Sequence, residues 1–362
     1  MYMDDLNEPM KLNCGQRLMN KIGLAPLTNK QSNEDGTLND REFEWLKMRG
    51  GHYGLISTCA TYVSKDGKAW EGQLGLSEDR HIKNLQRLTD EIKMSGSKII
   101  TQLHHGGDKA VFSNDKISCY DDTDIEVRNA SKEELQEVMN NYVLAAKRAE
   151  KAGFNGIEIH GANGYLFTQF LSHNTNKRND EYGGDIEGRS RLLLETVEAV
   201  RRNVSKNFMV NVRISPVNTY SLKGIDIEET ILVAKWLGEL NIDILSLSLR
   251  EYNMETIFED QNYPVIQLIR DETNDNMKIA TAGNIWSRAD AVNAREIGAD
   301  MILLGRAGIV HPDWPTVSSK MNFKPYYPKW DPAIFQKVGV SKVFHNYLLK
   351  FPGLVVGGAE KR

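Results

Sequence analysis

The sequence predicts an α/β fold, a single (β/α)₈ TIM barrel. Eight short apolar runs typical of buried strands follow one another along the chain, and amphipathic helical patterns lie between them. This alternation favours a parallel sheet, and eight repeats favour a closed barrel. An open doubly wound sheet would need a glycine-rich turn after its first strand, but residues 25–36 read APLTNKQSNEDG. Since no repeat, linker or low-complexity tract is present, residues 1–362 are expected to form one domain.

Each expected element can be placed by residue number. Strand-like runs occupy 22–27, 53–62, 98–104, 156–160, 208–215, 242–249, 278–282 and 301–304. Helical periodicity occupies 40–49, 78–94, 132–151, 187–203, 227–240, 265–271 and 287–297. The third helix should begin at a capping box of Ser131 and Glu134 and should end at Gly153. The polar segment 106–129 has no periodicity, so we interpret it as a long loop over the third strand, of the kind that forms lids or substrate walls.

Composition excludes several classes of partner and site. The chain carries 45 Lys and Arg against 49 Asp and Glu side chains, a formal net charge of −4, and it has no basic block. Nucleic acid and acidic membrane surfaces are therefore poor partners. The acidic N-terminal residues MYMDDLNEPM are not followed by an apolar run, so neither a signal peptide nor a membrane span is expected. Cys14, Cys59 and Cys119 are too few and too widely spaced for a disulfide framework or a metal centre. We expect a cytoplasmic protein with no metal.

Residues 158–191, EIHGANGYLFTQFLSHNTNKRNDEYGGDIEGRSR, carry the clearest functional signal. The fourth strand runs into a glycine-rich turn that holds His160, Asn163 and Tyr165. Two hydrogen-bonding side chains and a phenol at one strand end suit a site that holds a carbonyl oxygen and delivers a proton. His160 by itself would be equally consistent with a structural histidine, but the shared turn favours function. The charged tail behind the turn is interpreted as a structural brace, made by Arg178, Asp180, Arg189 and Arg191.

Alternation along the strands directs further polar side chains toward the barrel axis. His160, Gln102 and Arg213 all fall on inward positions near strand ends. A barrel interior is ordinarily apolar, so these groups would cost roughly several kcal/mol if nothing were bound to them. A polar, planar ligand across the barrel mouth would offset that cost. Arg213 has an alternative interpretation, a buried ion pair with Glu158 or Asp243.

The last two strands end in glycines that suit a phosphate. Gly283 follows the seventh strand and Gly305 follows the eighth, where backbone N–H groups of this type of barrel commonly bind phosphate. Arg306 adds a permanent charge able to contact phosphate oxygens through two N–H groups. The pattern indicates a phosphorylated ligand without identifying it.

These features closely resemble the Old Yellow Enzyme family of FMN-dependent ene-reductases. Residues 160–184 match the family fingerprint H-x-A-[NH]-G-Y-L-x-x-Q-F-L-S-P-x-x-N-x-R-x-D-x-Y-G-G, with His173 in place of the usual Pro. The resemblance extends in order from about Cys14 to about Pro315. It implies FMN as cofactor, NADH or NADPH as reductant, and a small enone or quinone as substrate. Assembly into a homo-oligomer is left open.

The resemblance also implies a role for each candidate residue. His160 and Asn163 would anchor the substrate oxygen, and Tyr165 would donate the proton. Residues 1–362 would then form a single FMN-binding barrel domain. The cofactor would be held by Pro26, Thr28, Ala60, Gln102, Arg213, Gly283, Gly305 and Arg306. The pocket wall should differ from that of relatives, because His104 stands where they carry Trp or a smaller residue and Asp108 where they carry Arg.

Two alternatives belong to other classes of protein. A flavin-free phosphate-binding barrel enzyme, such as a glycosidase or a Schiff-base aldolase, would need two facing carboxylates or an inward lysine. Glu158 is the only candidate carboxylate that we identify at a strand end, so the sequence disfavours both of these enzyme classes. The second alternative is a non-catalytic or redox-sensing flavoprotein, against which the intact set of His160, Asn163 and Tyr165 argues.

Overall fold

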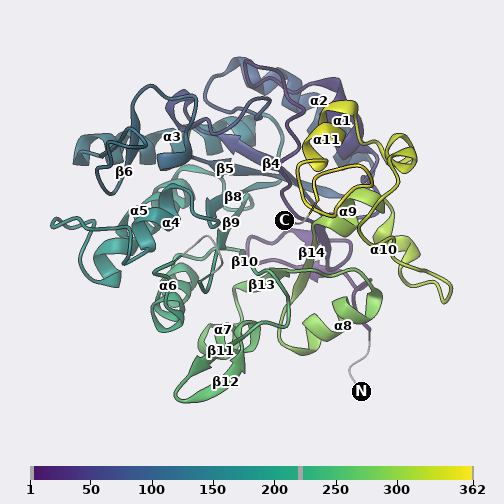
Figure 1. Ribbon diagram of the computed structural model, residues 1–362. Helices are drawn as coiled ribbons and strands as arrows, with labels where there is room; N and C mark the ends of the chain where they lie inside the picture. Colours follow the sequence, from purple (N-terminus) through teal and green to yellow (C-terminus); the bar gives the residue numbers. More distant parts are fainter. Residues whose placement is uncertain (1–3, 219–222, 361–362) are drawn as a thin grey trace.

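Eight parallel strands close into a barrel in the computed structural model, which describes residues 4–218 and 223–360. The strands follow chain order around the barrel, and the last pairs with the first to close it (Figure 1). They are β3 (Ile22–Leu24), β4 (Leu55–Tyr62), β5 (Lys98–His104), β8 (Gly156–Gly161), β9 (Met209–Ile214), β10 (Ile244–Ser248), β13 (Lys278–Ala282) and β14 (Met301–Leu304). The predicted fold class, a (β/α)₈ barrel, is confirmed.

All eight barrel strands lie within, or within one residue of, the runs predicted for them, and β5, β13 and β14 match residue for residue. The first strand is shorter than predicted because it stops at Leu24, just before Pro26, which has no N–H for the ladder. Pairing between β4 and β5 shifts in register between Ser57 and Ala60. As a result Ala60 lies opposite Gln102, and two predicted site residues meet on neighbouring strands.

Seven predicted helices surround the barrel (Figure 1). They are α1 (Asp40–Lys47), α2 (Arg80–Met94), α3 (Lys132–Lys151), α5 (Ile186–Asn203), α6 (Ile227–Glu239), α7 (Val265–Glu272) and α8 (Arg288–Glu296). Helix α3 begins with the predicted capping box, in which Ser131 and Glu134 exchange both hydrogen bonds. Gly153 follows its end with a φ of 84°, a left-handed conformation that favours glycine.

Several shorter elements were not predicted. They are the strands β1 (Met10–Lys11), β2 (Arg17–Leu18), β6 (Lys116–Ser118), β7 (Val127–Asn129), β11 (Glu255–Phe258) and β12 (Gln261–Pro264), the helices α4 (Leu166–Leu171), α9 (Arg306–Val310), α10 (Trp314–Val317) and α11 (Lys342–Leu348), and the 3₁₀ turns η1 (Lys65–Gly67), η2 (Gly107–Lys109) and η3 (Pro332–Val338). The segment 106–129, interpreted as a long loop over the third strand, contains η2 and the short parallel β6–β7 pair, which were not expected. Periodicity cannot identify pieces this short.

The barrel interior is apolar at one end and polar at the other. Inward side chains near the strand starts form an apolar cluster that includes Leu55, Ile100, Met209, Ile244, Ala280, Met301 and Leu303. Nearer the strand ends Glu158 accepts hydrogen bonds from Gln102 (2.7 Å) and Ser246 (2.6 Å). Ile157 and Ile159 belong to the core beneath the helices, as their alternation predicted. Polar side chains thus gather where the C-terminal strand ends open to ligands.

The C-terminal segment packs on the outside of the barrel, where α11 lies close to α1 and α9 (Figure 1, yellow). Trp45 and Phe344 meet edge to face with ring centres 5.5 Å apart. The buried guanidinium of Arg49 donates to the carbonyls of Gly308 and Ile309 at 3.1 and 3.0 Å. In the described ranges, no helix is long and apolar enough to cross a bilayer, and no group of three or more His, Cys, Asp or Glu could hold a metal.

Candidate active site

The three predicted catalytic residues lie on one turn after β8. His160 is the penultimate residue of the strand, Asn163 has a φ of 62°, and Tyr165 immediately precedes α4. The backbone N–H of Asn163 donates to Oγ of Ser215 (2.9 Å), and Oγ of Ser248 donates to Oδ1 of Asn163 (3.0 Å). Because the amide oxygen of Asn163 is already engaged, its NH₂ group is left to donate to a ligand.

Two rings from outside the turn, those of His104 and Trp70, pack against its His160 and Tyr165. The His104 ring centre lies 4.4 Å from that of Tyr165 and 5.5 Å from that of His160. Trp70 lies 5.2 Å from His104 and 6.2 Å from Tyr165. Within the described residues, Nδ1 of His160, Nε2 of His104 and Nε1 of Trp70 are buried and have no hydrogen-bond partner. Unpaired buried polar atoms cost free energy, so the arrangement suits a polar ligand that would pair with them.

Burial keeps the side chains of this turn uncharged. Burial, together with the charges of Arg213 and Lys109, lowers the pKa of His160 to about 3. Burial also lowers the pKa of His104 well below its ordinary value. The pKa of Tyr165 is raised to about 12, again mainly by burial. At neutral pH the site therefore offers neutral imidazoles and a protonated phenol, which suit hydrogen bonding to an oxygen and donation of a proton.

Arg213 reaches the same space from β9. Burial lowers its pKa, while the charge of Glu158 acts in the opposite direction. Its Nη2 donates to Oγ of Ser248 (3.2 Å), and its Nη1 has no partner among the described residues. The alternative of a buried ion pair is wrong in the described part of the chain, because neither Glu158 nor Asp243 has a carboxylate oxygen within 4.0 Å of the guanidinium nitrogens. Arg213 thus keeps a free donor and a positive charge for a ligand.

The predicted phosphate end is a cavity of about 320 Å³ between the ends of β13 and β14. Gly283 and Gly305 line it together with Arg306. Gly283 has a φ of 152°, and a Cβ there would lie 2.6 Å from the backbone nitrogen of Tyr252. Oδ1 of Asn284 accepts from Nη2 of Arg306 (2.8 Å) and so orients the guanidinium. Glycine backbone and a positioned arginine are what a phosphate cradle requires.

The other predicted cofactor residues lie on the first strands of the barrel and on the loop after β3. Pro26 belongs to the phosphate-end cavity and also to a neighbouring cavity of about 430 Å³ that Thr28 and Tyr347 line. Burial raises the pKa of Tyr347, and the hydroxyl of Thr28 beside it acts in the opposite direction. Ala60 is buried beside Trp70. Six of the eight predicted cofactor residues therefore line these two cavities, namely Pro26, Thr28, Arg213, Gly283, Gly305 and Arg306, whereas Ala60 and Gln102 face each other on β4 and β5.

The charged tail after the turn is engaged in structural contacts. Arg178 donates to the carbonyl of Ala130 and to Asp180, both at 2.6 Å. Arg189 donates to the carbonyl of Leu171 at 3.0 Å and pairs with Glu229. These bonds hold the loop between α4 and α5 and agree with its interpretation as a brace.

Four residues of the site were not identified from the sequence. Ser248 lies on an inward position at the end of β10, so strand alternation contains a signal for it. Lys109 lies in η2, inside the segment interpreted as a lid or wall. Trp70 lies in an irregular segment and Tyr347 in α11, beyond the part of the chain that carries the resemblance. Neither residue had a sequence signal.

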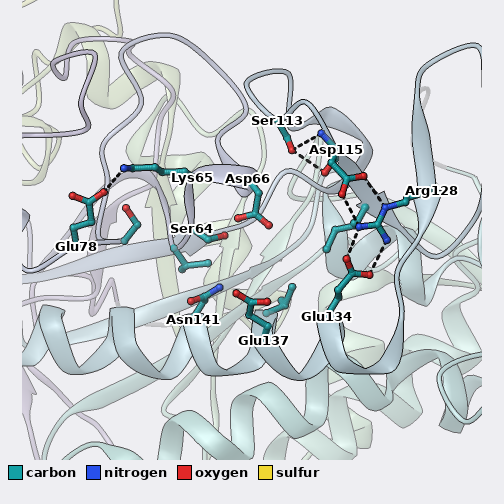
Figure 2. A pocket seen from close by; sticks show the side chains of 14 residues that line it. Ser64, Lys65, Asp66, Glu78, Ser113, Asp115, Arg128, Glu134, Glu137 and Asn141 are labelled. Carbon is teal, nitrogen blue, oxygen red and sulfur yellow. Dashed lines mark hydrogen bonds and ion pairs between the residues drawn. The ribbon is translucent and has the colours of Figure 1, made fainter.

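A separate cavity of about 390 Å³ lies against α3 (Figure 2). It is lined by residues of η1, α3 and the β6–β7 segment, and it shares no residue with the site described above. Most of its charges are already paired: Arg128 with Asp115 and Glu134, and Lys65 with Glu78. We therefore assign the ligand site to the barrel mouth.

The chain resembles known proteins over most of its length. It is 32% identical over 321 residues to a probable NADH-dependent flavin oxidoreductase, YqiG of Bacillus subtilis, covering 85% of this chain and 86% of that one. It is 31% identical to the NADH:acrylate oxidoreductase of Vibrio harveyi over 86% of this chain, but it spans only 33% of that longer protein. The structure of an old yellow enzyme homologue from Zymomonas mobilis superposes with a TM-score of 0.78 at 26% identity, covering 95% and 99% of the two chains.

Fold, relatives and cavity agree on one class of protein, the FMN-dependent NAD(P)H oxidoreductases. The family model described as NADH:flavin oxidoreductase / NADH oxidase matches residues 5–322. The chain belongs to this family, with FMN as cofactor and NADH or NADPH as reductant. The site fits that cofactor, because Nη1 of Arg213 is buried without a partner in the described part of the chain and the Gly283 backbone could not accommodate a side chain.

Proposed function

We propose that this enzyme reduces the C=C bond of α,β-unsaturated carbonyl compounds. One observation carries the proposal: His160, Asn163 and Tyr165 lie on a single turn beside the cationic Arg213, and Nδ1 of the neutral His160 is buried with no partner among the described residues. A carbonyl oxygen needs donors, and an alkene that receives hydride needs a proton. The name of the acrylate oxidoreductase relative gives an alkene conjugated to a carboxyl group as that protein's substrate, which supports the same class of reaction.

The proposed roles follow from the chemistry of each side chain. When bound, FMN supplies the redox chemistry, accepting hydride from NADH or NADPH and delivering it to the β-carbon of the substrate. His160 and Asn163 hold the carbonyl oxygen by hydrogen bonds and so draw electron density from the alkene. Tyr165 gives its phenolic proton to the α-carbon and is reprotonated from solvent. The balance is one NAD(P)H and one proton consumed for each C=C bond reduced.

We also propose that residues 1–362 form a single FMN-binding domain. Pro26, Thr28, Ala60 and Gln102 would contact the flavin ring, and Arg213 would balance negative charge on it. The phosphate would be held by the predicted glycines and arginine after β13 and β14, namely Gly283, Gly305 and Arg306.

The test uses protein reconstituted with FMN under anaerobic conditions. NADH or NADPH should bleach the flavin absorbance, and cyclohexenone should restore it with formation of cyclohexanone. If the nicotinamide reduces the flavin but no alkene reoxidises it, the ene-reductase function is wrong. That result would favour the alternative of a redox-sensing flavoprotein. A protein that takes up no FMN would overturn the assignment of the barrel mouth.

A further inference from the structure

Lys109 places a positive charge beside the proposed substrate anchors. We propose that Lys109 is a specificity-determining residue that pairs with a carboxylate of the substrate, so that the enzyme favours α,β-unsaturated carboxylates over uncharged enones. This inference rests on the ene-reductase function proposed above, and it names the substrate class of the same site.

The ammonium of Lys109 lies directly over the catalytic turn. Its Nζ is 5.2 Å from the ring centre of Tyr165 and 3.4 Å from the backbone oxygen of Asn163. A Cβ on Gly164 would lie 2.6 Å from the same nitrogen, so the ammonium rests against the turn itself. A group held by His160 and Asn163 would therefore have this cation as a close neighbour.

No carboxylate of the described chain neutralises Lys109 by contact. Its Nζ has no Asp or Glu oxygen within 4.0 Å among the described residues. The adjacent Asp108 is occupied elsewhere, since it accepts from Nε2 of Gln169 (2.6 Å) and from the hydroxyl of Tyr120 (2.8 Å). One weak bond to a carbonyl leaves the ammonium with donors to spare, because lysine carries three N–H groups.

The backbone that carries Lys109 is fixed. In η2 the N–H of Lys109 donates to the carbonyl of Gly106 (3.2 Å), and its own carbonyl accepts from Val111 (2.9 Å). The N–H of Asp108 donates to Oε1 of Gln169 (3.2 Å), which joins η2 to α4. The fold thus fixes the backbone from which the exposed Lys109 side chain reaches the turn, so the entropy of ordering concerns the side chain alone.

The other side chains of the turn supply no charge. Arg213 and Lys109 are the two cations whose charges lower the pKa of His160. Arg213 belongs to the proposed flavin site, so Lys109 is left to face the substrate. Neutral donors suffice for the oxygen of a ketone, but a carboxylate brings a full negative charge into a partly desolvated site. A nearby cation offsets that cost.

Equilibrium binding tests the inference without turnover. Benzoate and benzamide have nearly the same shape and differ in charge, and each is titrated calorimetrically into the oxidised FMN-loaded protein. Lys109→Gln should weaken benzoate binding by about tenfold, the usual worth of one charge-assisted hydrogen bond, and change benzamide binding less than about twofold. Lys109→Arg should restore most of the benzoate affinity. Equal effects on both ligands, or none, would overturn the inference.

Turnover gives a second readout with the matched pair acrylate and acrylamide. The ratio of kcat/KM for acrylate to that for acrylamide should fall about tenfold in Lys109→Gln. The control is Lys65→Gln, which also removes one lysine but from a residue whose Nζ lies 2.6 Å from Glu78 outside the site (Figure 2). This control should leave the ratio unchanged. A ratio that does not move in Lys109→Gln would exclude a role in charge recognition.

The two proposals fail in different ways. If the parent protein reduces acrylamide and cyclohexenone but its preference for acrylate does not depend on Lys109, only the specificity inference is wrong. If the parent reduces none of the three alkenes, the ene-reductase function is wrong, and the comparison of benzoate with benzamide still decides whether Lys109 recognises a carboxylate.

Discussion

The Ser248 hydroxyl donates a 3.0 Å hydrogen bond to Oδ1 of Asn163. The Ser248 hydroxyl oxygen in turn accepts a hydrogen bond from Nη2 of Arg213 at 3.2 Å, so Ser248 joins a proposed cofactor residue to a proposed substrate anchor. By engaging the amide oxygen of Asn163, it fixes the NH₂ group as the donor that a substrate meets. Ser248 thus acts as a positioning residue.

Replacement of Ser248 by Ala tests this relationship. The amide of Asn163 should then lose its preferred orientation, and reduction of cyclohexenone should slow by about fivefold, as expected for one hydrogen bond of roughly 1 kcal/mol. The rate of flavin reduction by NADH or NADPH should change little, since that half-reaction uses no substrate anchor. Stopped-flow measurement of both half-reactions provides the check. Equal slowing of the two would indicate a distorted site instead.

Arg213→Ala should weaken FMN binding by about tenfold or more and lower the flavin midpoint potential, because the negative charge of reduced flavin loses its partner. Arg213→Lys keeps the charge but not the planar fork, so it should fall between parent and Ala variant. Fluorescence titration gives the affinity and dye-coupled reduction gives the potential. If both quantities equal those of the parent, the assignment of Arg213 is incorrect.

Tyr165→Phe removes one phenolic proton and almost no volume. Flavin reduction by nicotinamide should proceed at close to the parent rate, whereas reoxidation by cyclohexenone should slow by roughly two orders of magnitude or more, the worth of a positioned general acid. Reoxidation by a quinone or by dioxygen should change little, because neither needs a proton delivered to carbon. A variant that reduces cyclohexenone at the parent rate would remove Tyr165 from the mechanism.

The lowered pKa of His160 predicts the direction of a pH effect on stability. The folded protein holds this imidazole neutral down to a pH of about 3, whereas the ordinary value is 6.5. Below pH 6.5 the unfolded chain therefore binds a proton that the folded protein does not, and stability is lost as pH falls. Between about pH 7.5 and about pH 5, the parent should lose about 2 kcal/mol more than His160→Gln. Urea unfolding at fixed FMN concentration measures the difference, and equal losses would show that His160 is not buried neutral.

Much of the barrel could be predicted from the sequence because its strand–helix unit repeats. Eight strand runs and seven helices follow from periodicity, and side-chain alternation correctly directs Ile157 outward and Glu158 inward. Short elements could not be predicted in this way. The six residues of α4 are all buried, and the three-residue strands β6 and β7 obtain their order from pairing with each other. Their structure is set by tertiary contacts that no local pattern encodes.

In the candidate site, too, local patterns predict some features and tertiary contacts determine the others. His160, Asn163 and Tyr165 share one turn, so their proximity is visible in the sequence. The neighbours that set their chemistry come from elsewhere: Lys109 from η2, Ser248 from β10 and Trp70 from an irregular segment. The sequence also could not show that Arg213 keeps a free donor. Arg213 keeps it because the carboxylate of Glu158 accepts hydrogen bonds from Gln102 and Ser246 instead.

The charge of Lys109 also bears on how the two substrates exchange. A nicotinamide ring gains a positive charge when it gives up its hydride. An ammonium fixed above Tyr165 would then repel the spent coenzyme ring, whereas it tolerated the neutral ring that entered. We expect the same lysine both to hasten departure of the oxidised coenzyme and to attract an anionic alkene into the vacated place, so that a single charge would favour the exchange of one substrate for the other.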